Sequence, residues 1–297
     1  MSPDRYRLSP EDHQRIFERR IVRDLFVEPR AAESPKAIVF GGQPGAGKSE
    51  AVGRALNELS KESSAIAIVG DDFRAYHPKY AELLRKDDRT AAFYTDRDTA
   101  LWVEKSIAHA LALRAHVVIE GTMRNPDKVA STLSDFRRAC YQTEARVLAV
   151  PPRLSALGIA HRYELQRANY HHGRLTLPEA HQAALDGMPK TIERIEHDRL
   201  ADTLTIEHRD GSRVYANRLA GDRWQAPTGA VEAMRAEHAR PLASSELHQL
   251  RDGYAVVAAL MKNRGASATE RQAANAESER ATRELGMSRV MGHDLDR

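Results

Sequence analysis

The sequence of 297 residues contains a single cysteine, Cys140. One thiol cannot close an intramolecular disulfide, and it excludes the paired Cys-x-x-Cys ligands of structural zinc sites. We therefore expect a protein that resides in a reducing compartment.

Long apolar runs and a strong charge of either sign are also missing. No stretch approaches 18 consecutive apolar residues, so the sequence predicts no membrane-spanning helix. The first twenty residues, MSPDRYRLSPEDHQRIFERR, lack the apolar segment of a secretory signal. The 45 basic and 42 acidic residues leave a net charge of only +3, whereas nucleic-acid binding favours a clustered basic face. We expect a cytoplasmic protein with no membrane or nucleic-acid partner.

Short apolar runs alternate with helical patterns through the first two thirds of the chain. The runs are continuous and rich in Val, Ile and Ala, which is typical of strands buried on both faces of a parallel sheet. They lie at 37–40, 64–70, 115–122 and 144–152, and the helical patterns cover about 48–60, 96–114, 126–140, 153–170 and 178–198. This alternation predicts an α/β fold of three layers with a mostly parallel sheet.

The two ends of the chain carry further signals. Ser9-Pro10-Glu11-Asp12 predicts the start of a helix over 9–29, and Asp210-Gly211 predicts a β-hairpin turn. Additional C-terminal helices are expected near 229–241 and 244–263, and the polar tail beyond them is either an exposed helix or partly disordered. The expected division is one domain over residues 1–224, which includes the N-terminal helix, and a helical extension over 225–297.

A glycine-rich loop follows the first strand. Its residues are Gly42, Gln43, Pro44, Gly45, Ala46, Gly47, Lys48 and Ser49, and they match the phosphate-loop pattern between a strand and a helix. The glycines let successive N–H groups turn inward onto phosphate, and the helix adds its positive end. The lysine reaches the β and γ phosphates, and the serine hydroxyl is a ligand for Mg²⁺. The loop therefore predicts a site for ATP or GTP.

Acidic side chains follow the next two strands. Asp71 and Asp72 end the second strand, and Glu120 and Thr122 end the third. The carboxyl ends of parallel strands share one edge, where ligands bind. A carboxylate there can orient an attacking hydroxyl or take its proton, although an Asp at a strand end is also a common helix cap. Glu120 is a candidate for holding a magnesium-bound water. The alternative is that Glu120 is an ordinary buried acid paired to an arginine.

Two arginines, Arg162 and Arg174, lie in the helical region after the fourth strand. Phosphoryl transfer needs cations around the equatorial oxygens, although arginines are also common on solvated helices. The neighbouring pair His171-His172 lacks a familiar ligand spacing, so we assign it a structural role. No Gly-x-Ser-x-Gly elbow is present, so acyl transfer has no support.

Together these motifs resemble the zeta toxin family of P-loop kinases. The resemblance rests on GGQPGAGKS, GDDFRAYHPKY, VVIEGTMRN and HRYELQ with a following Gly-Arg, and it runs from about residue 9 to about 219. It implies a P-loop kinase fold and a bacterial enzyme. Such an enzyme uses ATP and Mg²⁺ to phosphorylate the 3′-hydroxyl of the amino sugar of UDP-N-acetylglucosamine.

The resemblance also implies roles for individual residues. Lys48 and Ser49 would bind phosphates and magnesium, with Glu120 beside the metal. Asp71, rather than Asp72, matches the family's catalytic base, and Arg162 and Arg174 match two arginines that clamp the phosphates. The positions expected to bind the acceptor are Glu104, Thr122, Arg124 and Thr132.

The family further implies a partner, a small helical antitoxin that covers the nucleotide site. The terminal helices of this chain could instead act in cis. Two other functions stay open: a P-loop kinase of another nucleotide sugar, a nucleoside or an antibiotic, and a nucleotide-dependent switch or interaction module. The last of these would form no phosphorylated small molecule.

Overall fold

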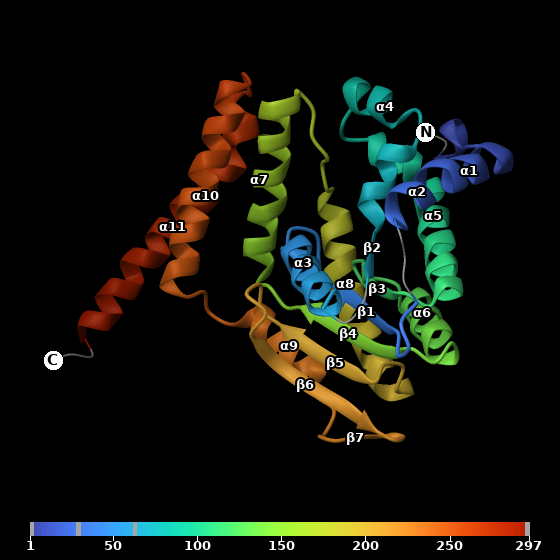
Figure 1. Ribbon diagram of the computed structural model, residues 1–297. Coiled ribbons are helices and arrows are strands. Elements are labelled where there is room, and N and C mark those ends of the chain that lie inside the picture. Colours follow the sequence, from blue (N-terminus) through green and yellow to red (C-terminus); the bar gives the residue numbers. More distant parts are fainter. Residues whose placement is uncertain (1–2, 28–30, 62–63, 295–297) are drawn as a thin grey trace.

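The computed structural model describes residues 3–27, 31–61 and 64–294, with side chains as far as residue 287. Its centre is one seven-stranded sheet in the order β2-β3-β1-β4-β5-β6-β7 (Figure 1). The first five strands in this order are parallel to one another, β6 is antiparallel to β5, and β7 is antiparallel to β6. The strands are β1 (Lys36–Gly41), β2 (Ala65–Val69), β3 (His116–Glu120), β4 (Gln142–Leu148), β5 (Thr203–Glu207), β6 (Arg213–Ala220) and β7 (Arg223–Trp224). The predicted mostly parallel sheet and the predicted hairpin are confirmed.

Both faces of the central strands are buried, as their continuous apolar runs predict. In β1, Val39 belongs to one apolar cluster and Ile38 and Phe40 to the other. Neighbouring β3 alternates in the same way, with Val117 on the first side and Val118 on the second. Each strand therefore supplies side chains to two cores, and helices must cover both faces.

One helical layer contains α3 (Lys48–Leu59), α7 (Pro152–Tyr170), α10 (Ser244–Asn263) and α11 (Ala268–Asp294). The other contains the N-terminal helical segment, α5 (Ala91–Leu113), α6 (Pro126–Arg138), α8 (Pro178–Asp198) and α9 (Ala230–Ala239). Figure 1 shows α10 and α11 side by side, with α10 against α7. Among the described residues, no helix is long and apolar enough to span a bilayer.

The N-terminal helix differs from the prediction. The Ser9 hydroxyl caps α1 (Pro10–Ile16) by accepting a bond from the Asp12 amide at 3.1 Å, so the predicted start is confirmed. The helix then widens into a π-helical segment, η2 (Phe17–Ile21), and ends as α2 (Val22–Leu25). Phe17 and Ile21 are both buried, so the wider turn keeps the Phe17 ring and the branched side chain of Ile21 on the packed side. The helix ends at Leu25, and Phe26 and Val27 are not helical, so the prediction of a helix to residue 29 is too long. Positions 28 and 29 lie outside the described residues.

Three short elements escaped the sequence patterns: η1 (Pro3–Tyr6), η3 (Gly70–Tyr76) and α4 (Tyr80–Lys86). They are too short to show a helical period. The polar tail forms α11, which contributes Ala274 and Ala281 to the core beneath α10. Its helical state is thus explained by packing against α10, and small alanines permit the close approach.

Candidate active site

The phosphate loop leaves β1 in the middle of the sheet. Here β3 lies on one side and β4 on the other, which is the point where open α/β sheets bind ligands. Gly45 and Gly47 have φ angles of 80° and 87°, a left-handed conformation that glycine adopts without strain. Helix α7 crosses so closely that a Cβ on Gly158 would lie 2.6 Å from the Gly45 carbonyl oxygen. The loop is therefore held between β1 and α7.

The Lys48 ammonium lies against the main chain of this loop and near Glu120. Its Nζ lies 2.8 Å from the Gly42 carbonyl oxygen and 3.2 Å from that of Gln43, and 3.7 Å from Oε1 of Glu120. Burial lowers the pKa of the Lys48 ammonium, and the charge of Glu120 opposes this in part. Moving a few ångströms would let the ammonium exchange these neutral carbonyls for a phosphate oxygen.

Asp71 lies opposite the loop, in η3, and two arginines hold it. Nη1 of Arg174 lies 2.7 Å from its Oδ2, and Nε of Arg74 lies 3.3 Å from its Oδ1. Burial alone would raise the pKa of the Asp71 carboxyl, but the charges of Arg174 and Arg74 hold that pKa below its usual range. Asp71 is thus ionised at neutral pH and available as a hydrogen-bond acceptor.

Arg74 is a second arginine in contact with Asp71, and the motif analysis left it without a role. Its guanidinium is buried, donates to Asp96 Oδ1 at 2.7 Å and to the Ala92 carbonyl at 2.9 Å, and so ties η3 to α5. It orients Asp71 from behind. The Phe-Arg pair in GDDFRAYHP was the available signal.

Arg162 is half-buried near Arg174. Nη2 donates to Thr176 Oγ1 at 2.9 Å, Nε is buried without a hydrogen-bond partner, and no carboxylate in the described part of the chain lies within ion-pair distance. Burial and the nearby charge of Arg174 lower the pKa of Arg162 to about 10. A half-buried cation with a buried, unbonded Nε is stabilised by an anion, so the site favours a polyphosphate.

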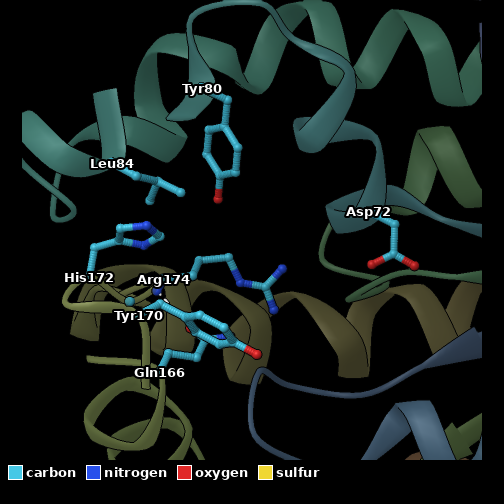
Figure 2. Close-up of a pocket in the computed structure, with 8 residues that line it drawn as sticks. Asp72, Tyr80, Leu84, Gln166, Tyr170, His172 and Arg174 are labelled. Carbon is cyan, nitrogen blue, oxygen red and sulfur yellow. Dashed lines mark hydrogen bonds between the residues drawn. The ribbon is translucent and has the colours of Figure 1, made fainter. Parts of the chain in front are cut away.

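A cavity of about 300 Å³ opens beside Asp72 and Arg174 (Figure 2). Rings of Tyr80 and Tyr170 and the Arg174 guanidinium border it. Burial raises the pKa of the Asp72 carboxyl, which also faces this space. The other lining residues are Leu84, Gln166, His172 and Gly173. The structure thus separates the two neighbouring acids: Asp71 is fixed by arginines, and Asp72 borders the open cavity.

The four predicted acceptor positions lie on and beside α5 and α6. Glu104 is paired with Lys128 at 3.4 Å, and both side chains are exposed. Thr132 Oγ1 donates to the Lys128 carbonyl within α6. Thr122 and Arg124 lie in the segment after β3, where the Arg124 backbone abuts Gly187 of α8. No hydrogen bond or ion pair among the described residues joins these four to Lys48 or Asp71, so their role stays a prediction.

The oxygen ligands that a hard cation needs are present but sparse. Ser49 is exposed in the first turn of α3, and burial raises the pKa of the Glu120 carboxyl. No group of three or more His, Cys, Asp or Glu side chains in the described ranges could hold a metal ion by itself. Any Mg²⁺ here would therefore complete its shell with water and phosphate oxygens.

The central phosphate loop, the carboxylate across from it and the converging arginines define a P-loop nucleotide-binding protein of the kinase type. Comparison with known proteins then places it more closely. A profile described as Zeta toxin matches residues 19–220, more than half of the chain. The chain belongs to the zeta toxin family.

Curated relatives are similar over the same region. Toxin PezT of Streptococcus pneumoniae is 29% identical over 197 residues, which cover 66% of this chain and 77% of PezT. Toxin zeta of Enterococcus hirae is 29% identical over 206 residues, 68% of this chain and 71% of that protein.

Solved structures share the fold. A structure from the PezAT chromosomal toxin–antitoxin system of Streptococcus pneumoniae has a TM-score of 0.72 at 23% identity, covering 86% of this chain and 99% of that chain. The AvrRxo1-ORF1:-ORF2 complex has a TM-score of 0.51 at 13% identity, covering 96% and 87%. At these identities the likeness concerns architecture alone.

Proposed function

We propose that this protein transfers the γ-phosphate of ATP to the 3′-hydroxyl of the amino sugar in UDP-N-acetylglucosamine. The observation that carries the proposal is an ionised Asp71 held by two arginines, with the half-buried Arg162 near enough for their charges to interact. Among the described residues, no carboxylate lies within ion-pair distance of Arg162, and its buried Nε has no hydrogen-bond partner. A switch protein needs the phosphate site alone. A carboxylate facing that site adds the acceptor half of a kinase.

The chain's own residues divide the work. The loop amides and Lys48 hold the donor phosphates, while Arg162 and Arg174 supply positive charge to the equatorial oxygens as the transferring group separates. Asp71 accepts a hydrogen bond from the acceptor hydroxyl, aligns it with the γ-phosphorus and takes its proton as the new P–O bond forms.

Binding of substrate must rearrange one contact. Asp71 Oδ2 is engaged by Arg174 at 2.7 Å, so a γ-phosphate would draw Arg174 toward itself and free that oxygen for the hydroxyl. Ser49 and Glu120 would hold Mg²⁺ together with the phosphates, and the ion would neutralise charge on the β and γ oxygens.

A small helical antitoxin is the partner we propose, in the bacterial cytoplasm. The proposal rests on membership of the zeta toxin family and on the toxin–antitoxin system named for the similar PezAT structure. Co-expression of the antitoxin chain should suppress toxicity. The antitoxin should then co-purify with the protein. Release of growth inhibition by Lys48→Met alone would place the toxicity at the phosphate loop.

The test is an acceptor panel. Purified protein is incubated with ATP and Mg²⁺ and, separately, with UDP-N-acetylglucosamine, other UDP-sugars, a nucleoside or an aminoglycoside, and each product is weighed by mass spectrometry. We expect one added phosphate on UDP-N-acetylglucosamine and none when EDTA removes Mg²⁺. Phosphate on a different acceptor would keep the kinase and change its substrate, whereas ATP binding without any phosphorylated product would refute the reaction.

A further inference from the structure

Arg209 reaches the phosphate loop from a distant part of the chain. It lies in the turn between β5 and β6, and its side chain extends to the outer side of the loop. Nη2 donates to the Gly45 carbonyl at 2.9 Å and to the Leu154 carbonyl at 3.2 Å, and Nε donates to the Ala46 carbonyl at 3.2 Å. One guanidinium thus joins two consecutive loop residues to the start of α7.

The chemical setting of this guanidinium is unusual. Within the described residues, no carboxylate lies within ion-pair distance of Arg209, and its side chain donates its hydrogen bonds to main-chain carbonyls there. Burial lowers the pKa of Arg209, and the more distant charges of Glu50 and Glu246 oppose this. The group still carries its charge at neutral pH, because arginine titrates far above it. A half-buried cation is therefore held directly behind the site for phosphates.

The position of those carbonyls explains its use. A phosphate loop directs its N–H groups inward, so its carbonyls point outward and need donors of their own. The planar fork of arginine supplies parallel donors to two neighbouring acceptors, which a single ammonium cannot match in geometry. Fixing Gly45 and Ala46 from outside fixes the direction of the amides that follow them.

The turn that presents Arg209 is itself restrained. Arg54 of α3 donates to the Arg209 carbonyl at 2.8 Å, and Asp210 Oδ1 accepts bonds from the Ser212 amide at 2.8 Å and its hydroxyl at 2.7 Å. The side chain also passes along Gly47, where a Cβ would lie 3.7 Å from it. Contacts from α3 and from within the hairpin therefore hold the turn, and through Arg209 they restrain the phosphate loop.

We propose that Arg209 is a positioning residue for the donor phosphates: it holds the phosphate loop in its binding shape and adds a positive charge behind it. The inference rests on the proposed nucleotide binding and assigns a part of it to a residue outside the recognised motifs. Because the loop is ordered before the ligand arrives, less of the binding free energy is lost to ordering it.

The test compares Arg209→Met with Arg213→Met in the full chain. Arg213 is an exposed arginine on the same hairpin, so its loss controls for a change of net charge. Calorimetry measures the Kd of ATP and, separately, of inorganic tripolyphosphate. We expect Arg209→Met to weaken both by about tenfold or more, since charge-assisted hydrogen bonds are lost, and Arg213→Met to leave both within about twofold.

Three further readouts separate positioning from simple loss of stability. The KM for ATP should rise while the KM for the acceptor stays constant, and amide exchange at residues 42–47 should speed up without ligand. Arg209→Lys, which keeps the charge but not the fork, should fall between wild type and Arg209→Met. If the Met variant does not fold, the Lys variant carries the same comparison.

Two results would overturn the inference. Unchanged tripolyphosphate binding in Arg209→Met would do so, and so would a loss confined to ATP, since that loss would place Arg209 against the nucleoside. A wild-type chain that binds neither probe would instead overturn the proposed function, and the inference with it.

Discussion

Replacing Gly158 with alanine tests how closely α7 lies against the phosphate loop. Alanine is the better helix former by about 1 kcal/mol, so helix propensity alone predicts stabilisation. The structure predicts the opposite sign. The new Cβ would lie 2.6 Å from the Gly45 carbonyl oxygen and 3.2 Å from its Cα, and backbone on both sides leaves no flexible side chain to move.

Overpacking of this kind costs about 1–3 kcal/mol, and a contact between two backbones belongs at the upper end. Subtracting the propensity gain leaves a loss of about 2 kcal/mol, or a melting temperature lower by about 4 °C. The displaced loop should also bind ATP more weakly. Gly53→Ala is the matched control, because it lies inside α3, directly after the loop, with nothing within 4 Å of its Cβ.

The assay is thermal unfolding of both variants with and without ATP. Gly53→Ala should raise stability by up to about 1 kcal/mol and leave nucleotide binding intact, whereas Gly158→Ala should lower both. If Gly158→Ala is as stable as Gly53→Ala and binds ATP equally well, the close contact between α7 and the loop is not present in the protein.

Three other outcomes are expected. Asp71→Asn should retain ATP binding but lose at least about 100-fold in kcat, as expected when a positioned acid–base group is removed; a fully active variant would eliminate Asp71 as the base. Arg264→Ala should destabilise the fold by about 2–3 kcal/mol in chemical unfolding. The substitution leaves the buried Glu164 carboxylate on α7 without its bidentate ion pair, and an unchanged denaturation midpoint would refute this. Burial raises the pKa of Glu120 above its usual 4.5, so Mg²⁺ affinity in the presence of ATP should be full above that raised pKa and fall as the pH drops through it. Glu120→Gln should abolish this pH step, and an identical step in that variant would assign it to another group.

Local patterns in the sequence predicted the layers and the phosphate loop. Runs such as AIVF and VVI are apolar on every residue, and only a strand covered on both faces buries all of them. The glycines of the loop and the Asp210-Gly211 turn require particular backbone conformations. These signals are carried by neighbouring residues, so they can be read without knowing the fold.

The remaining parts of the site depend on contacts between distant segments. Arg209 lies more than 160 positions from the loop carbonyls it holds, and an arginine in a polar hairpin turn resembles any solvated one. The ion pair between Glu104 of α5 and Lys128 of α6 also has no signal in the sequence that would predict it. Short elements such as α4 and the π-helical turn at Phe17–Ile21 carry too few residues for a period.

The C-terminal helices illustrate the same limit from another side. From its sequence, the polar tail could be either an exposed helix or partly disordered. In the structure it packs on α10 and is helical, as α11. Arg153 of α7 pairs with Glu277 and Glu284 of α11 at 3.1 and 2.9 Å. The division of the chain at residues 224 and 225 stays a prediction, which expression of residues 1–224 alone would test by its melting behaviour.

Transfer of phosphate to a sugar nucleotide is the central claim, and one measurement addresses it directly. Wild type and Asp71→Asn are incubated with ATP, Mg²⁺ and UDP-N-acetylglucosamine, and the sugar nucleotide is examined by mass spectrometry and phosphorus NMR. The account predicts one new phosphomonoester at the 3′-hydroxyl of the amino sugar with wild type and none with the variant. An unmodified sugar nucleotide after wild type has bound ATP, or equal product from both proteins, would contradict it.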